Sequence, residues 1–345
     1  MRRPNIPKAL RNRITGVVIG LFSVVLLTCS PLTLFAQTGP KPVAAPDPSS
    51  SPLSDTNGAK DRTLRQEVDM VLANASVIDA YGRVVTGLDA GDFRIFEDGV
   101  EQEISHFSTE DVPVSIGIIL DMSGSMKDKF EKSRLATLQF LKTANPQDQF
   151  FLVSFNDRAQ LVTPFTDRVE DLQEPLMFMS AKGMTALFDG IYLGLTEMKD
   201  ARNRKRALLI ISDGGDNHSR YNERDIRRFL KEADVQVYAI GIYEPYGSCP
   251  TPEECWGPSL LTELTEMSGG RTFRVDNLNE LPDVATKISL ELRNQYVIGF
   301  KPLKHAPDGK WHKIKIKLHP PRGLPPLTVY TRSGYTSGSP MATAR

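Results

Sequence analysis

Four nearly continuous apolar runs mark the middle of the chain, at residues 116–120, 150–155, 207–211 and 235–242. Runs of this length without polar alternation are typical of strands buried on both faces of a parallel sheet. Between them, apolar side chains recur at helical spacing, at Leu187, Ile191, Leu195 and Met198 and again through residues 226–233. This alternation over residues 112–292 predicts a doubly wound α/β domain with a mostly parallel sheet flanked by helices.

Short alternating runs on either side of this domain predict antiparallel strands instead. In the first flank, residues 64–111, they fall at 68–72, 75–79, 93–96 and 104–107; in the second, residues 293–335, they fall at 295–300, 311–318 and 327–330. A turn is expected at Tyr81-Gly82 and another around Gly99. Each flank is small for an independent fold. We therefore predict that the two flanks pack together as one small all-β module into which the α/β domain is inserted.

The first 36 residues contain five basic and no acidic side chains, followed by an apolar core over 14–27 that ends near Phe35-Ala36. This is the pattern of an export signal, cleaved after about residue 36. A membrane anchor is the alternative, but the apolar core is shorter than the ~20 residues that a spanning helix needs. Cys29 also leaves lipidation open. Residues 37–63 are rich in Pro, Ser, Ala and Gly and predict a disordered linker, and residues 336–345 a tail.

Charge and cysteine content narrow the function further. Lys plus Arg and Asp plus Glu both number 42, so no basic excess points to nucleic acid. The lysines at 313, 315 and 317 alternate with apolar residues and indicate the solvated face of a strand. With Cys29 removed, Cys249 and Cys255 remain. In an oxidising compartment they are expected to form a disulfide, with a free pair or a zinc half-site as the alternatives.

Five oxygen-bearing side chains follow predicted strands or open a predicted helix: Asp121, Ser123, Ser125, Thr185 and Asp213. Asp121 ends the run 116–120, and Asp213 follows the run 207–211. Open α/β sheets bind ligands beyond the carboxyl ends of their strands, so these segments are expected to converge there. Carboxylate and hydroxyl oxygens suit a hard divalent cation such as Mg²⁺.

This ordered set resembles the metal-ion-dependent adhesion site of the von Willebrand factor A domain, which has the form Asp-x-Ser-x-Ser, then a threonine, then an aspartate. The resemblance covers about residues 112–292, and the flanks are similar to those of bacterial secreted proteins with such a domain. It implies that Ser123 and Ser125 bind Mg²⁺, or Mn²⁺ in its place, directly. Thr185 would bind directly or through water, and Asp121 and Asp213 through water.

The resemblance also implies a function. The expected activity is binding, not catalysis: an exported adhesion module at the cell surface, in the periplasm or in the medium, which grips a Glu or Asp carboxylate of a partner protein. In related domains a shift of the C-terminal helix, here residues 279–292, changes affinity.

Other interpretations of the same residues remain. Singly, Ser123, Ser125 or Thr185 could cap helices, Asp189 could favour a helix dipole, and Asp216 could stand in a turn. As a set, they could serve a metal-assisted hydrolase or a scaffold with a structural metal. The five histidines show no triad-like setting, with only His218 near the site in sequence, and the chain has no phosphate-binding glycine loop.

Overall fold

The computed structural model describes residues 70–109, 111–243, 252–302, 309–321 and 323–337, without the side chains of residues 253 and 254. All of them belong to one compact unit, residues 64–345. The export signal predicted over 1–36, the linker over 37–63 and Cys29 lie outside the described residues. Within the described ranges, no helix has the length and apolar character that crossing a bilayer requires.

A six-stranded sheet forms the centre of the α/β part, in the order β10-β9-β8-β5-β6-β7. Its strands are β5 (Val114–Asp121), β6 (Gln149–Phe155), β7 (Ala159–Thr166), β8 (Lys205–Ser212), β9 (Gln236–Ile242) and β10 (Thr272–Val275). All neighbours pair in parallel except β7, which runs antiparallel to β6 at one edge. The predicted mostly parallel sheet is therefore confirmed.

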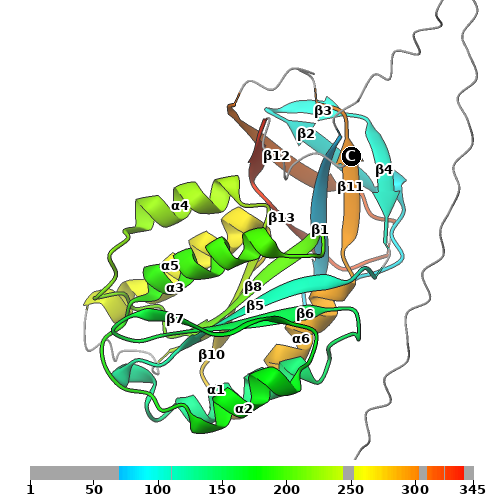
Figure 1. The fold of residues 1–345 in the computed structure, drawn as a ribbon. Coiled ribbons are helices and arrows are strands. Elements are labelled where there is room, and N and C mark those ends of the chain that lie inside the picture. Colours follow the sequence, from blue (N-terminus) through cyan, green and yellow to red (C-terminus); the bar gives the residue numbers. More distant parts are fainter. Residues whose placement is uncertain (1–69, 110, 244–251, 303–308, 322, 338–345) are drawn as a thin grey trace, which may run out of the picture. The chain divides into compact units, whose positions relative to one another are not determined.

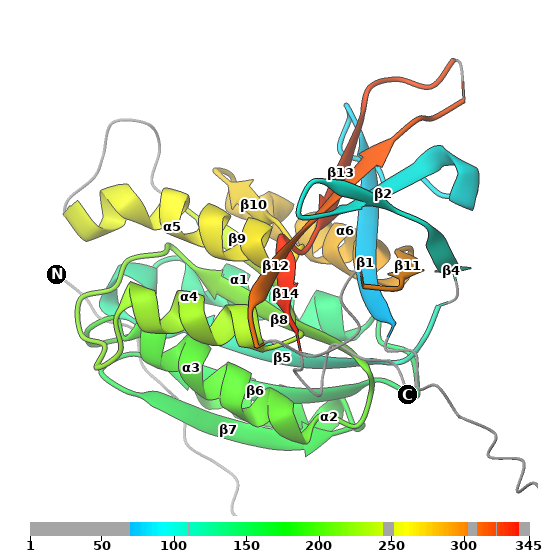
Figure 2. The same cartoon turned by 90° about the horizontal axis from the view of Figure 1, so that it is seen from above.

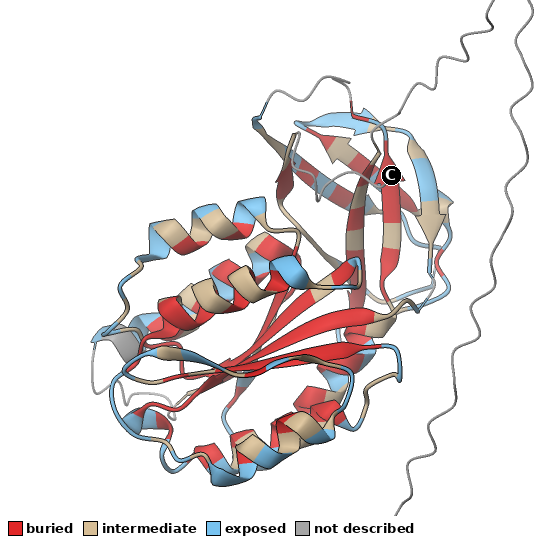
Figure 3. Cartoon of the chain, viewed as in Figure 1, coloured by how far each residue is buried: buried red, intermediate tan, exposed pale blue. Residues whose placement is uncertain are grey.

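Helices cover both faces of this sheet (Figure 1, Figure 2). One layer holds α1 (Phe130–Leu141), α2 (Glu170–Phe178) and α6 (Leu281–Arg293); the other holds α3 (Leu187–Glu197), α4 (Glu223–Glu232) and α5 (Pro252–Ser268). Along β5, Ile118 and Leu120 join the first layer while Ile119 joins the second. Because both faces are covered, every residue of β5 is buried, which is why its sequence shows no polar alternation (Figure 3).

The two flanks form two four-stranded antiparallel sheets, β13-β1-β11-β4 and β14-β12-β2-β3. Their strands are β1 (Val71–Asp79), β2 (Phe93–Glu97), β3 (Val100–Gln102), β4 (Ile104–Ser108), β11 (Tyr296–Phe300), β12 (Trp311–Leu318), β13 (Leu327–Thr331) and β14 (Gly334–Thr336). β1 from the first flank pairs with both β11 and β13 from the second, and β2 pairs with β12. A shared core that includes Phe93, Tyr296 and Ile314 joins the sheets. The flanks thus make one β module, as predicted.

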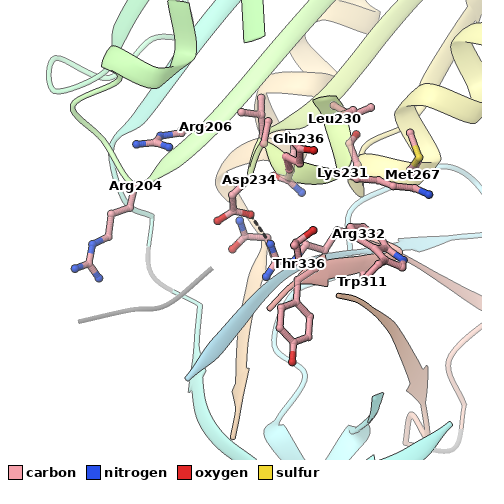
Figure 4. Close-up of a pocket in the computed structure, with 17 residues that line it drawn as sticks. Arg204, Arg206, Leu230, Lys231, Asp234, Gln236, Met267, Trp311, Arg332 and Thr336 are labelled. Carbon is pink, nitrogen blue, oxygen red and sulfur yellow. Dashed lines mark hydrogen bonds and ion pairs between the residues drawn. The ribbon is translucent and has the colours of Figure 1, made fainter. Parts of the chain in front are cut away.

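Contacts from the end of α4 and from α5 reach this β module. Arg332 Nη1 lies 2.6 Å from Asp234 Oδ1, and Arg332 Nη2 donates to the carbonyl of Leu72 at 2.8 Å. Figure 4 shows this pair in the pocket where Lys231 Nζ lies 5.4 Å from the Trp311 ring centroid. An ion pair therefore links the β module to the α/β domain, in addition to the covalent connections between them.

The structure differs from the sequence-based prediction in several elements. The described end of the strand expected over 68–72 and the strand expected over 75–79 belong to a single strand, β1, since Ala73 and Ala75 continue its buried face; residues 68 and 69 lie outside the described residues. The strand β7 and the short strands β3, β10 and β14 were not predicted. β7 contains Pro164, which an edge strand tolerates but which weakens a strand signal. Short 3-10 helices complete the fold: η1 (Ala90–Asp92), η2 (Gly124–Met126), η3 (Met198–Asp200) and η4 (Leu278–Glu280).

Candidate metal centre

The predicted site residues follow the carboxyl ends of neighbouring central strands. β5 and β8 are parallel, with Leu120 opposite Ile211, so Asp121 and Asp213 emerge at the same edge of the sheet. β6 lies on the other side of β5, with Phe155 opposite Asp121. The turn after β5 and the loop after β8 therefore begin within reach of each other, whereas Thr185 lies in the loop that joins α2 to α3.

Asp121 anchors the first turn. Its side chain is fully buried, Oδ1 accepts a hydrogen bond from Ser123 N at 2.9 Å, and Oδ2 accepts one from Ser212 Oγ at 2.6 Å. Ser212 Oγ in turn accepts from Gly214 N at 3.0 Å. One carboxylate thus ties the turn after β5 to the end of β8.

The two serine hydroxyls lie side by side. Ser123 Oγ and Ser125 Oγ are 3.0 Å apart, Ser123 being buried and Ser125 exposed. Ser123 precedes η2 but its side chain makes no capping hydrogen bond, and α1 begins only at Phe130, after Lys129. The helix-capping interpretation of these serines is therefore wrong.

The loop that carries Thr185 is bonded to both of the others. Gly124 N donates to the carbonyl of Gly183 at 2.9 Å, and Thr185 N donates to Asn217 Oδ1 at 2.9 Å. The carbonyl of Thr185 accepts from Asn217 N at 3.0 Å. Thr185 is nearly buried, and the residue preceding α3 is Ala186, so Thr185 is not the cap of that helix.

Asp213 is buried, and its two carboxylate oxygens have different surroundings. No described residue donates a hydrogen bond to its Oδ1, while Oδ2 lies 3.8 Å from Lys129 Nζ. Burial, followed by repulsion from Asp213, raises the pKa of Asp121 above its usual range. A cation bound near these two buried carboxylates would reduce the repulsion between them.

These features fit a small, hard cation. All five candidate side chains offer oxygen, the donor that Mg²⁺ and Mn²⁺ prefer. Adjacent ligands of an octahedron with ~2.1 Å bonds lie ~3.0 Å apart, the separation of the two serine oxygens. Asp213 Oδ1, which accepts no hydrogen bond from a described residue, would be available as an acceptor for a water bound to such a cation. No group of three His, Cys, Asp or Glu side chains suited to a metal occurs in the described ranges, and this set has only two carboxylates.

Other residues near the site have structural roles. Asp189 accepts hydrogen bonds from the backbone and side chain of Arg220, at 2.9 Å each, and Asp216 Oδ2 accepts from Phe188 N at 3.0 Å. Both carboxylates thus fasten the loop after β8 to the start of α3. Cys249 lies outside the described residues, so the predicted disulfide with Cys255 stays a prediction.

Four further residues support the site and were not predicted from the sequence: Asn217, Asp157, Ser212 and Lys129. Asp157 Oδ1 accepts from Met184 N at 2.8 Å and supports the loop that carries Thr185. Asp157 also follows the apolar run 150–155, and that position was a usable signal. Lys129 gave no such signal, because its burial beside Asp213 depends on how α1 packs.

Part of the chain is similar to a known protein family and to several known proteins. Residues 116–215 match the profile of the von Willebrand factor type A domain. An uncharacterised protein of Borreliella burgdorferi is 26% identical over 187 residues, 47% of this chain and 54% of that protein. The inter-alpha-trypsin inhibitor heavy chain 4 of Mus musculus is 28% identical over 195 residues, 51% of this chain but 20% of that protein.

The matching segment therefore spans about half of one relative and a fifth of the other. A von Willebrand factor type A structure from Catenulispora acidiphila aligns with a TM-score of 0.45 at 12% identity, covering 81% of this chain and 77% of that one. Residues 116–215 are thus similar to a von Willebrand factor type A domain, and they lie in the part of the chain that forms β5, β6, β7 and β8 of the central sheet.

Proposed function

We propose that this chain is an exported, Mg²⁺-dependent protein-binding module that recognises an acidic group of a partner protein. The cation would be held by Asp121, Ser123, Ser125, Thr185 and Asp213, with Mn²⁺ able to replace Mg²⁺. The observation that carries the proposal is the pair of serine hydroxyls 3.0 Å apart, at the same sheet edge as a buried, unpaired carboxylate oxygen of Asp213.

The residue types favour binding over catalysis. Hydroxyl groups are neutral, so Ser123 and Ser125 would themselves compensate none of the cation's charge. When bound, the cation would offer a positive charge and an open coordination position to an incoming carboxylate oxygen. Hydrogen bonds from Ser123 N and Ser212 Oγ hold the carboxylate of Asp121 and fix the orientation of its two oxygens.

Mn²⁺ titration of the full chain tests the metal part, with free Mn²⁺ followed by electron paramagnetic resonance. We expect saturable binding that Mg²⁺ displaces, and a loss of about tenfold or more in affinity for Ser125→Ala and for Asp213→Asn. Ser105→Ala is the matched control, since Ser105 is an exposed serine on β4 in the β module. Affinity in Ser125→Ala equal to that of Ser105→Ala would contradict the proposal.

Affinity capture tests the binding part. The immobilised chain is exposed to exported proteins in Mg²⁺ or in EDTA, beside an Asp121→Ala variant on the same support. A specific partner should be retained in Mg²⁺, released by EDTA, and absent from the variant. Proteins that are retained equally in EDTA would argue against a metal-dependent interaction.

A further inference from the structure

Lys129 is a buried cation next to the candidate metal centre. The residue is 9% exposed, and its ammonium lies 3.8 Å from the carboxylate of Asp213, which is itself 5% exposed. Lys129 N donates to the carbonyl of Met126, and its own carbonyl accepts from Ser133 N as α1 begins. The helix start therefore fixes the backbone from which this side chain reaches Asp213.

The two carboxylate oxygens of Asp213 have different neighbours. One oxygen, Oδ2, faces the ammonium of Lys129, while no described donor reaches the other, Oδ1. An ammonium this deeply buried is costly unless a charge of opposite sign lies close to it. Asp213 supplies that charge and still presents Oδ1 to the site.

We propose that Lys129 sets the affinity of this centre for its cation and leaves the loaded centre positively charged toward an acidic partner. The inference rests on the proposed function. With Asp121 and Asp213 ionised, a divalent cation alone would give a formally neutral centre. Lys129 makes the total +1, so the centre binds its cation less tightly and attracts a carboxylate more strongly.

Because Lys129 is buried, its charge should affect the metal centre more strongly than the charges of the neighbouring lysines. Lys127 lies on the same turn but is exposed, as is Lys182 in the loop before Thr185. Water and salt screen those exposed charges, whereas a charge inside the protein acts through a lower effective dielectric constant. Lys129 should therefore dominate the electrostatic effect of the surrounding lysines on the centre.

The test measures Mn²⁺ affinity in variants of the full chain, again by paramagnetic resonance. Lys129→Met removes the charge but keeps a long apolar side chain, and should raise the affinity by about tenfold or more. Lys129→Arg keeps the charge and should stay within about threefold of wild type. Lys127→Met is the matched control for an exposed lysine and should change the affinity less than about twofold. Unchanged or weaker Mn²⁺ binding in Lys129→Met would overturn the inference.

Thermal unfolding separates this role from simple structural support. In EDTA, Lys129→Met should unfold at a lower temperature than wild type, because Asp213 loses its partner. Rising Mn²⁺ should then stabilise the variant more than wild type, so that the difference between them shrinks or reverses. A difference that is the same at every Mn²⁺ concentration would mean that Lys129 only supports the fold.

A peptide probe tests the consequence for the partner. In Mn²⁺, the tripeptide Gly-Glu-Gly, acetylated at its N-terminus and amidated at its C-terminus so that its only carboxylate is the Glu side chain, should bind wild type more tightly than Lys129→Met. The equally blocked Gly-Gln-Gly should bind neither. Equal binding of Gly-Glu-Gly to both would refute the charge argument. If wild type binds no Mn²⁺, the proposed function itself fails; if it binds Mn²⁺ and Lys129→Met binds no tighter, only the inference about Lys129 fails.

Discussion

Gly183, in the loop that carries Thr185, has a backbone conformation that is unfavourable for residues with a side chain. Its φ is +91°, and a Cβ atom placed there would lie 2.8 Å from Asp157 Oδ1. Gly183→Ala therefore combines two costs. The left-handed backbone costs about 1–2 kcal/mol for a residue with a side chain. Displacing Asp157 also breaks its hydrogen bond to Met184 N, worth about 1–2 kcal/mol at an exposed position.

Gly87 provides a matched control for the first cost. It is also exposed and has a φ of +81°, but a Cβ atom there would meet no other atom within 4 Å. Gly87→Ala should therefore lose about 1–2 kcal/mol, and Gly183→Ala about 2–4 kcal/mol. The difference between the two variants isolates the contact with Asp157.

Urea unfolding followed by far-ultraviolet circular dichroism measures both losses, provided that the slopes of the transitions agree. Mn²⁺ affinity gives a second readout. The carbonyl of Gly183 accepts from Gly124 N, so a displaced loop should weaken Mn²⁺ binding in Gly183→Ala and leave it unchanged in Gly87→Ala. Equal stability losses in the two variants would refute the reasoning about Asp157.

Three further predictions concern the body of the domain. Gly117→Ala should cost about 3 kcal/mol or more in urea unfolding, because a Cβ would lie 2.1 Å from the Phe151 ring; a loss under about 1 kcal/mol would contradict this. Asp148→Ala should cost about 3–5 kcal/mol by the same assay, since it leaves the Arg293 guanidinium, 2.6 Å away, without its buried partner; a loss typical of exposed pairs would count against it. Burial lowers the pKa of Lys205 to about 8 from 10.5. The folded state therefore binds fewer protons than the unfolded chain between these values, so stability should rise over that range by up to about 3 kcal/mol. Unfolding at pH 7.5 and 9.5 should show this rise in wild type and not in Lys205→Met, and equal rises would exclude Lys205 as the cause.

Much of the fold could be predicted because its signals are local. A strand covered on both faces needs an uninterrupted apolar run, and β5, β6, β8 and β9 all have one. A helix against a sheet needs apolar residues at its own period, as α3 has. β7 lacks these signals because it is a partly exposed edge strand that tolerates polar residues and proline, and β14 lacks them because it has only three residues.

The candidate site also has some features with local sequence signals and others without them. The oxygen-bearing residues that follow the strands can be recognised in the sequence, because strand ends and turn residues are marked locally. Which of these residues meet depends on the packing of the folded chain. Ser212 Oγ bonds to Asp121 across 91 positions of sequence, and Lys129 meets Asp213 because the residue that precedes α1 lies beside the residue that follows β8. Such contacts depend on the order of strands in the sheet and on the burial that this order creates. No local pattern of residues records either of these.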